Sequence, residues 1–512
     1  MSDTPVPLAG PGVTQAAQAE AAKTGATAAK GGAFAPPGLA WAIFELARNP
    51  YYVLINIYIF APYFGEVIGQ QMLANGALSG LPPEEAEQIA GAEGLATIAS
   101  VTKWAGFIAA FTAPFLGAAL DRGGRRKPLM AVFLGMLALA SWNLWYAAAD
   151  GTGYSVAMVM AIMVVGHISY TYSEVTHNAM LNVAGRPQSL PMISGLGLGL
   201  GNLAAAVLLL ALVLLFALPD MIGWPFAQAQ FGIDVEAGEH RRLVGPVTAV
   251  WLVIFVIPFF LFARDGGTPG ASWPAALSTG AKGLFRTLRR AKEQRNVLTF
   301  LGARMLYADA MAALLTLSAV YVTLFFKWTV VEMTVYAIVS SIFAFFGGLI
   351  GGRLDQLLGP KRALIVEISV MLATLILQLS ITPDRLFFGL MENRPVWGGF
   401  AFQELSDVVF LSSIAPLAIS ATASISSSRS MLVHLAPPAR VGEFFGLYAI
   451  AGTVTVWLGP LLVEIFARAF DSQRIGMSAI SLLFIAGLVV LMFVKADKTP
   501  EYLKEGSEAA RG

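Results

Sequence analysis

Five polar residues share one face of a strongly apolar stretch in the first half of the chain. They follow helical spacing (i, i+3, i+7, i+10, i+11) and are His167, Tyr170, Glu174, His177 and Asn178. An ionisable side chain within an apolar span costs roughly 2.5–3.5 kcal/mol, so this face should line the protein interior or water. There Glu174 could carry a proton or contact a substrate. Alternatively, Glu174 and His177 latch a gate at the helix end, or are solvated loop charges.

A second polar face lies near the start of the first apolar stretch. Glu45, Arg48 and Asn49 are spaced at i, i+3 and i+4. The pair Glu45 and Arg48 could bind the amine and the carboxylate of a zwitterion, or could form an ion pair at the inner membrane edge.

The second half of the chain holds further polar candidates within apolar stretches. One set comprises Arg304, Tyr307 and Asp309, and the other comprises Gln403, Glu404 and Asp407. Both sets could line a cavity or pair at an outer gate. No metal-ligand set stands out, and we expect neither a metal nor a cofactor.

The elements that carry these residues are expected to be membrane helices. Hydrophobic residues make up 56% of the chain and charged residues 13%, far fewer than the quarter or so typical of soluble domains. A spanning helix needs about 20 apolar residues. Twelve segments qualify: 40–68, 95–119, 128–149, 154–181, 190–217, 244–263, 297–326, 330–351, 362–381, 401–428, 441–467 and 475–494.

Lys and Arg residues predict which side of the membrane each loop faces. With both termini inside, the inner loops and tails hold 23 of these residues and the outer loops 7. The long segment between the halves carries Lys282 and Arg286 among apolar residues at helical spacing. It reads either as a basic amphipathic helix on the inner leaflet or as a solvated linker.

Two similar charged segments, 234 residues apart, indicate two related halves. Their spacing predicts an inner gate in which Asp121 faces the N-terminus of a neighbouring helix and the Arg residues pair across the halves, although simple topological anchoring is the alternative. The gate candidates are Gly117, Asp121, Arg122, Gly124 and Arg125 in the first segment, and Gly351, Asp355, Gly359, Lys361 and Arg362 in the second.

Regularly spaced glycines predict close helix packing. Two Gly-x-x-x-Gly pairs interleave in the fifth segment, and one pair occurs in the eleventh. Such pairs let helices approach closely, which suits a rocking interface and equally a static one. The residues are Gly195, Gly197, Gly199, Gly201, Gly442 and Gly446.

Several stretches together carry a family resemblance. They include 44–51, 172–181, 194–202, 304–309 and, most specifically, 428–460. The chain resembles the vacuole-effluxer-like branch of the major facilitator superfamily, whose founding members are similar to amino-acid exporters of the fungal vacuole. The family's Asp-Trp-Ala-Asn start on the first helix reads Glu-Leu-Ala-Arg-Asn here, so the substrate does not carry over.

The resemblance implies an all-α membrane protein with twelve transmembrane helices in two pseudo-symmetric six-helix bundles. We expect a disordered tail (1–38), bundles at 39–263 and 296–495, a basic linker (264–295) and a cytoplasmic tail (496–512).

The expected function is secondary active transport, not enzymatic catalysis. The cargo would be a small metabolite, with an amino acid first, exported by alternating access and coupled to a proton. Alternatives are a sugar–cation symporter, a lipid-moving carrier, or a non-transporting sensor or scaffold. We expect a monomer in the lipid bilayer of the bacterial inner (plasma) membrane, with both termini cytoplasmic. A net charge of +1 argues against nucleic acid as a partner.

Overall fold

The structure is a computed structural model in which residues 32–496 are described apart from short gaps. The gaps are at 77, 149–151, 218, 220–224, 227–229, 268–271, 290–293, 323–325, 329, 399–400, 438–439, 453–454, 456 and 471. Most of both expected tails, 1–38 and 496–512, lies outside the described residues, as do most side chains of the basic linker.

The N-terminal half consists of long helices with short helical turns between them. In chain order they are α2 (Pro36–Pro50), η1 (Tyr51–Tyr58), α3 (Phe60–Ala74), α4 (Pro83–Leu120), α5 (Arg126–Asn143), η2 (Leu144–Tyr146), α6 (Val156–Ala179), α7 (Leu181–Ala184), η3 (Pro187–Ser189), α8 (Leu190–Leu212), η4 (Val213–Ala217), η5 (Gln230–Gly232), α10 (Glu239–Arg242), α11 (Val244–Phe255) and α12 (Ile257–Phe262).

The C-terminal half repeats this pattern after the linker helix α13 (Trp273–Arg289). It comprises α14 (Arg295–Tyr321), α15 (Val330–Leu358), α16 (Pro360–Leu379), β1 (Arg385–Leu386), η7 (Phe387–Gly389), β2 (Met391–Glu392), α17 (Leu405–Leu435), α18 (Val441–Ile450), α19 (Leu458–Phe470), α20 (Gln473–Ser478) and α21 (Ile480–Met492). Strands β1 and β2 form a small antiparallel hairpin that pairs Arg385 with Glu392.

The apolar segments form helices because a helix satisfies every backbone hydrogen bond within itself, as the interior of a bilayer requires. Within the described residues, ten helices are long and apolar enough to cross a membrane, and the bent helix α4 makes eleven. The segment expected at 441–467 is divided between α18 and α19. The fold is the expected all-α membrane architecture.

Two expected boundaries were wrong in ways that matter for the site. The tenth span was placed at 401–428, whereas α17 starts at Leu405 and continues to Leu435. The eighth was ended at 351, whereas α15 continues to Leu358. Polar residues in the last turns lower hydropathy, but the helical hydrogen bonds continue through them.

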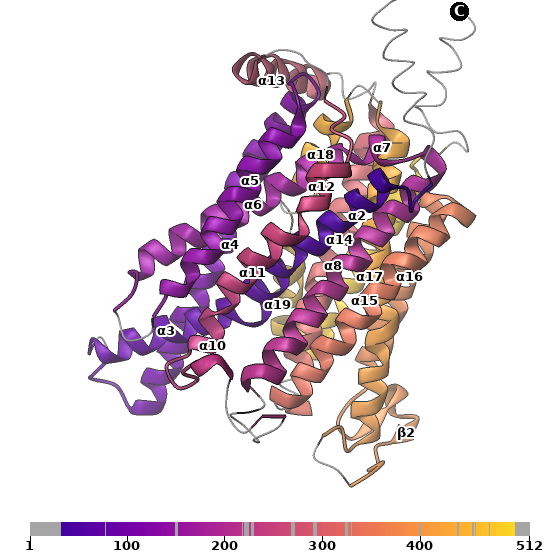
Figure 1. The fold of residues 1–512 in the computed structure, drawn as a ribbon. Helices are drawn as coiled ribbons and strands as arrows, with labels where there is room; N and C mark the ends of the chain where they lie inside the picture. Colours follow the sequence, from indigo (N-terminus) through magenta and orange to yellow (C-terminus); the bar gives the residue numbers. More distant parts are fainter. Residues whose placement is uncertain are drawn as a thin grey trace, which may run out of the picture.

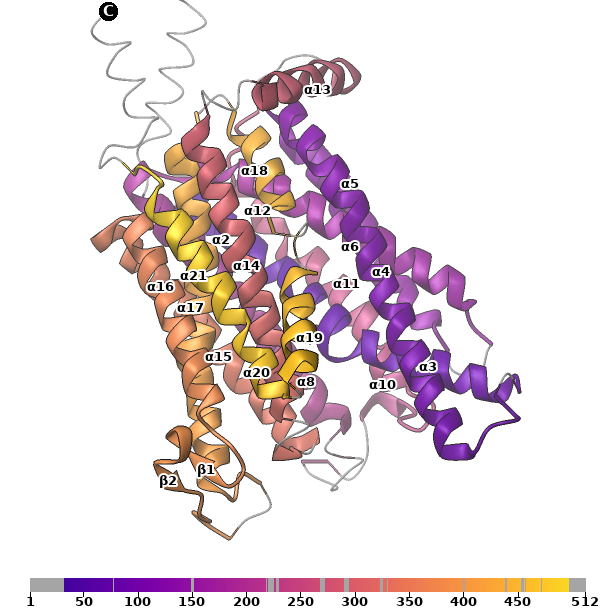
Figure 2. The same ribbon diagram turned by 180° about the vertical axis from the view of Figure 1, so that it is seen from behind.

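The two bundles lie side by side with α13 across one end (Figure 1). We call this the linker end, and the opposite end, where β1 and β2 lie, the hairpin end (Figure 2). Helix α4 packs along α18, and α8 packs along α15, so these two pairs join the halves. Helix α13 rests on the end of α4, where Gly280 meets Ala118 and Ala119.

The first span is not a uniform helix. Between α2 and α3, residues Tyr51–Tyr58 form a π-helical stretch that follows Pro50. Such stretches occur often at functional sites. Here it places Tyr51 and Tyr52 in stacked contact with Tyr170 of α6, at ring-centroid distances of 5.7 and 5.6 Å.

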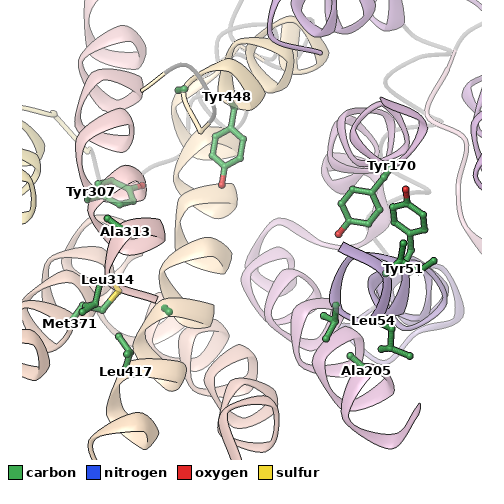
Figure 3. Packing of buried hydrophobic residues seen from close by; sticks show 14 of the residues in the cluster. Tyr51, Leu54, Tyr170, Ala205, Tyr307, Ala313, Leu314, Met371, Leu417 and Tyr448 are labelled. Carbon is green, nitrogen blue, oxygen red and sulfur yellow. The ribbon is translucent and has the colours of Figure 1, made fainter. Parts of the chain in front are cut away.

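The buried apolar side chains of the two bundles belong to one cluster. Within it, Figure 3 shows Tyr51, Tyr170 and their neighbours on one side, and Tyr307, Met371 and their neighbours on the other. The apolar interior thus extends across both halves, and the polar groups between them must be satisfied within it.

We predict that the linker end faces the cytoplasm. Ser79, before α4, and Ser278, on α13, are both exposed. Because the chain has no cysteine, each can be replaced singly by cysteine without background labelling. Ser79→Cys should react with an impermeant maleimide in intact cells, and Ser278→Cys only after permeabilisation. The reverse pattern would contradict the orientation.

Candidate functional site

Four charged side chains, three of them buried, link the two halves. Arg429 of α17 contacts Glu45 of α2 and Glu174 of α6, with nitrogen–oxygen distances of 2.9 and 3.2 Å. Arg48 of α2 contacts the same two carboxylates at 2.8 and 3.7 Å. These four residues are the charge cluster. Its two positive and two negative charges balance.

Burial makes the pairing within the cluster essential. Glu45, Arg48 and Arg429 are each 2% exposed, whereas the Glu174 side chain is 32% exposed. An unpaired charge at such depth is strongly destabilising. Arg48 gains further support from Tyr170, since its guanidinium lies 4.0 Å from the ring centroid and donates a hydrogen bond to the Tyr170 carbonyl.

His177 lies beside Glu45 and joins α6 to α2. Its ring is stacked between Trp41 and Phe44, at centroid distances of 3.9 and 4.1 Å. The His177 Nε2 lies 2.9 Å from the Trp41 carbonyl, so Nε2 must carry a proton to donate. Nδ1 then faces Glu45, 3.7 Å from its Oε1. His177 therefore ties α6 to α2 directly beside the cluster.

The cluster lies toward the linker end. At 1.5 Å per helical residue, Arg429 is about 9 Å from the end of α17 at Leu435, and Glu45 is about 14 Å from the start of α2 at Pro36. Small serines precede and follow Arg429 on α17. They leave room for its long side chain to reach across to the other half.

The structure brings only some of the residues predicted for these two faces into the cluster. Glu45, Arg48, Glu174 and His177 meet there, with Tyr170 beside them. Asn49 packs instead against Gly201 of α8. Asn178 is buried at 2% exposure. His167 lies farther along α6, where its carbonyl accepts a hydrogen bond from Thr171.

Arg429 was missing from the predicted site. Because the tenth span was predicted to end at residue 428, Arg429 was assigned to an inner loop and counted among the Lys and Arg residues that indicate topology. In the structure it is fully enclosed within α17. The available signal was its place in 428–460, the stretch most specific to the resembled family.

The predicted residues of α14 contact other helices of the C-terminal half. Arg304 donates to the Tyr448 carbonyl (2.8 Å) and lies over the Tyr448 ring, 3.5 Å from its centroid. The Tyr307 hydroxyl is 2.6 Å from that of Ser428. Asp309 accepts a hydrogen bond from the Gly459 N–H at the start of α19 (3.0 Å). Arg304, Tyr307 and Asp309 thus hold α18, α17 and α19, respectively, against α14.

The other predicted trio lies at or just before the start of α17. Glu404 is the N-cap residue, and its side chain and that of Asp407 form a reciprocal capping box. Asp407 also accepts a hydrogen bond from the Trp328 indole (2.8 Å). Gln403 pairs through its carbonyl with Val396. The contacts of Glu404 and Asp407 are those of a helix cap.

Asp121 joins the halves at the linker end. Its carboxylate accepts hydrogen bonds from the backbone N–H groups of Gly442 and Glu443, at 2.9 and 2.7 Å. These groups open α18, so Asp121 faces the positive end of that helix dipole. A side chain on Gly117 or Gly446 would collide with the opposing backbone, so glycine permits this close approach.

The basic partner of Asp121 is Arg126 of the same half, whereas the sequence predicted that Arg122 and Arg125 pair with carboxylates across the halves. The buried Arg126 lies 3.8 Å from Asp121 and donates to the Ala179 carbonyl. Arg122 instead donates to the Ala118 carbonyl in its own helix. The Arg125 side chain is exposed, and Gly124 lies in the turn. Arg126 starts α5, which directs its side chain inward.

The second charged segment has a different geometry. Asp355 lies in the last turn of α15 and is 4% exposed. Gly359 has a φ of 80°, which favours glycine at the turn into α16. Lys361 donates to the Met492 and Val494 carbonyls, and Arg362 is exposed. Gly351 packs on Ala423 of α17.

The glycine stripe of α8 serves two different neighbours. Gly195 and Gly199 face Gly348 of α15, across the interface between the halves, whereas Gly197 and Gly201 face α2. One helix thus packs closely on both its own half and the opposite one.

Comparison with known proteins places this geometry among membrane transporters. The family described as "Vacuole effluxer Atg22 like" matches residues 101–502. A Bacillus subtilis protein described as an uncharacterised MFS-type transporter is 21% identical, covering 92% of this chain and 97% of its own length. Autophagy-related protein 22 of Botryotinia fuckeliana is 25% identical over 60% of this chain, which spans about half of that longer protein.

Solved structures show the same fold. The Escherichia coli fucose:proton symporter superposes with a TM-score of 0.59 at 14% identity, covering 91% of this chain and 98% of the symporter. At this identity the likeness concerns the fold alone.

We predict that removing Arg429 destabilises the protein. Arg429→Met leaves the Glu45 and Glu174 carboxylates with Arg48 as the one remaining arginine of the cluster, so the free energy of unfolding should fall by about 3–5 kcal/mol. Glu174→Gln/Arg429→Met restores the charge balance and should recover part of the loss. Denaturant titration in detergent measures both. In the matched control, Arg468→Met breaks the exposed Arg468–Glu464 pair and should cost less than about 1 kcal/mol. Equal losses at both sites would contradict the cluster's role.

We predict that pH changes the closure of the linker end through Asp121. Burial raises the pKa of Asp121 to about 6, although backbone donors and Arg126 oppose this. In the closed state, Asp121 therefore holds its proton more tightly than it would in water. Raising the pH from about 4 to about 6 should favour opening, by up to about tenfold per unit.

Spin labels at Ser278→Cys and Leu357→Cys, both exposed, report this opening as a longer distance between the halves. Asp121→Asn should abolish the pH dependence in that window. An unchanged profile in Asp121→Asn would assign the effect to another group.

Proposed function

The chain belongs to the vacuole effluxer Atg22-like family, and on that premise we propose that this membrane transporter is a secondary active carrier of a small metabolite. In the major facilitator fold, the substrate binds between the two halves, which rock to alternate access. The proposed cargo is an amino acid or a similar small zwitterion, exported with a proton gradient as the driving force.

The charge cluster is the observation that carries this proposal. Arg429 belongs to the C-terminal half, and both of its carboxylate partners belong to the N-terminal half. Opening the linker end must separate these pairs, and closing it must form them again. A buried, balanced set of charges across a moving interface is suited to a gate that is stable only when shut.

The chemistry of the cluster favours a substrate with a carboxylate. Two guanidinium groups converge on Glu174, the one accessible member of the four. Glu174 contacts each arginine through one oxygen, so a substrate carboxylate could replace it and pair with either guanidinium at two points. Glu45 or the displaced Glu174 would then attract an amine.

Proton coupling through Glu174 follows from the same geometry. Adding a proton to Glu174 removes the negative charge that holds Arg429 and Arg48 together. The interface would loosen, and the proton would compete with a substrate amine for Glu174, so proton and substrate would occupy the site in turn, as export in exchange for a proton requires. This links proton binding, substrate binding and gate opening in one group of side chains. We further propose a monomer in the bacterial inner membrane with both termini cytoplasmic.

We predict that Glu174→Gln separates coupling from exchange. The amide keeps the shape of the side chain but cannot titrate, so uphill transport driven by a pH gradient should fall at least about tenfold. Counterflow exchange of a labelled amino acid should persist, because it requires rocking but no net proton release. Reconstituted vesicles loaded with amino-acid pools measure both activities.

The control is Glu464→Gln, which changes an exposed carboxylate on α19 and should leave both activities unchanged. Normal uphill transport by Glu174→Gln would rule out Glu174 as the coupling group. Absence of flux for every labelled solute in the parent protein would favour a sensor or scaffold on this fold.

A further inference from the structure

Two carboxylates are buried together in the C-terminal half, apart from the charge cluster. Asp355 lies at the end of α15 and Glu367 on α16, and they are 4% and 2% exposed. The hydroxyl of Ser427 on α17 donates to Glu367 Oε1 over 2.9 Å. Ser427 and Ser430 both lie beside the Asp355 carboxylate, and the two acids interact electrostatically.

Several polar atoms in this group lack a hydrogen-bond partner. Within the described part of the chain, they are both carboxylate oxygens of Asp355, Glu367 Oε2 and the Ser430 hydroxyl. Ser430 is itself 7% exposed. Four buried, unpartnered atoms at one place are unusual, because buried polar groups are almost always satisfied.

The charged groups around the pair are engaged elsewhere or exposed. On α17, Arg429 is held by Glu45 and Glu174. On α16, Lys361 is bonded to carbonyls of the α21 segment, and Arg362 is exposed, as is Arg353 on α15. From α14, Tyr307 bonds to Ser428. His434 of α17 lines the adjacent cavity.

Two neighbouring carboxylates cannot both stay ionised cheaply in such surroundings. A single proton resolves the conflict. The protonated acid becomes a donor, and the total charge of the pair falls from two to one. The Ser430 hydroxyl can donate to a remaining oxygen.

The pair can exchange protons with water at the linker end. A cavity of about 800 Å³ reaches Asp355 and Ser430, with Gln188 and Pro191 on its opposite wall. Its walls come from both halves, since Gln188 and Pro191 belong to η3 and α8. Rocking of α8 against α15 would therefore change access to Asp355.

We propose that Asp355 and Glu367 form a proton-binding site that exchanges with the aqueous phase at the linker end. The use of this proton in transport rests on the proposed function, but its binding does not. The site lies in the opposite half from Glu174 and thus gives the carrier a second place to hold a proton.

Infrared difference spectroscopy of the purified full-length protein across pH steps tests binding without any substrate. The parent should show titrating protonated-carboxyl bands, including that of Asp121, and Asp355→Asn and Glu367→Gln should each lose a component that Asp121→Asn and Glu174→Gln retain. Glu464→Gln is the control and should keep it. Unchanged titrating bands in both Asp355→Asn and Glu367→Gln would overturn the proposal. A sodium-specific rise in melting temperature that requires both acids would also overturn the proposal, because the site would then hold a metal cation. The rise would have to be about 2 °C or more relative to choline.

Two further measurements keep the test decisive. If the acid variants do not fold, Ser430→Ala should shift the midpoint of the titrating band, whereas Ser412→Ala, an exposed serine on the same helix, should not. Identical midpoints would overturn the proposal.

Loss of uphill transport with normal counterflow in Glu367→Gln would assign the proton to coupling, whereas failure of all transport in the parent would leave the spectroscopic result standing.

Discussion

The Arg429 guanidinium holds two carboxylates from the opposite half, and much of the linker end is arranged around that contact. A buried cation requires partners at close range because its desolvation penalty is large. Arg48 supplies the second positive charge, Tyr170 faces the Arg48 guanidinium, and His177 bonds to the Trp41 carbonyl beside Glu45. The result is a neutral, buried group that is stable only while α2, α6 and α17 remain together.

Close helix approach is what allows this pairing. Glycines at the two junctions, α4 with α18 and α8 with α15, remove the side chains that would otherwise separate the backbones. Asp121 then reaches the first turn of α18, and serines along α17 leave space for Arg429. Interhelical packing in a bilayer depends on such small residues, since lipid supplies little hydrophobic driving force between helices. The polar contacts add the specificity that packing alone lacks.

Helical periodicity was sufficient to place Glu45 with Arg48, and Glu174 with His177, on shared faces. The spacing of the charged segment was enough to direct Asp121 toward a neighbouring helix. Arg429 was not predicted as a site residue because hydropathy falls along the serine-rich end of α17, so the continuing helix was read as a loop. The 384 residues between Glu45 and Arg429 also carry no local signal of their contact. Glu404 and Asp407 lie at the edge of an apolar run, where a capping pair and a gate or cavity pair look alike in the sequence, and the structure adds the capping box of α17. The pairing of Asp355 with Glu367 depends on three helices meeting, which no single-helix pattern encodes.

The division of the eleventh segment into α18 and α19 has a mechanical consequence. The first turn of α18 is held by Asp121 from the N-terminal half, and that of α19 by Asp309 from the C-terminal half. Arg304 of α14 also donates to the Tyr448 carbonyl, so α18 is held from both halves, whereas the Asp309 contact holds α19 within the C-terminal half. Movement of one half against the other must therefore change the contacts of α18 with at least one of them, while α19 can keep its contact with α14.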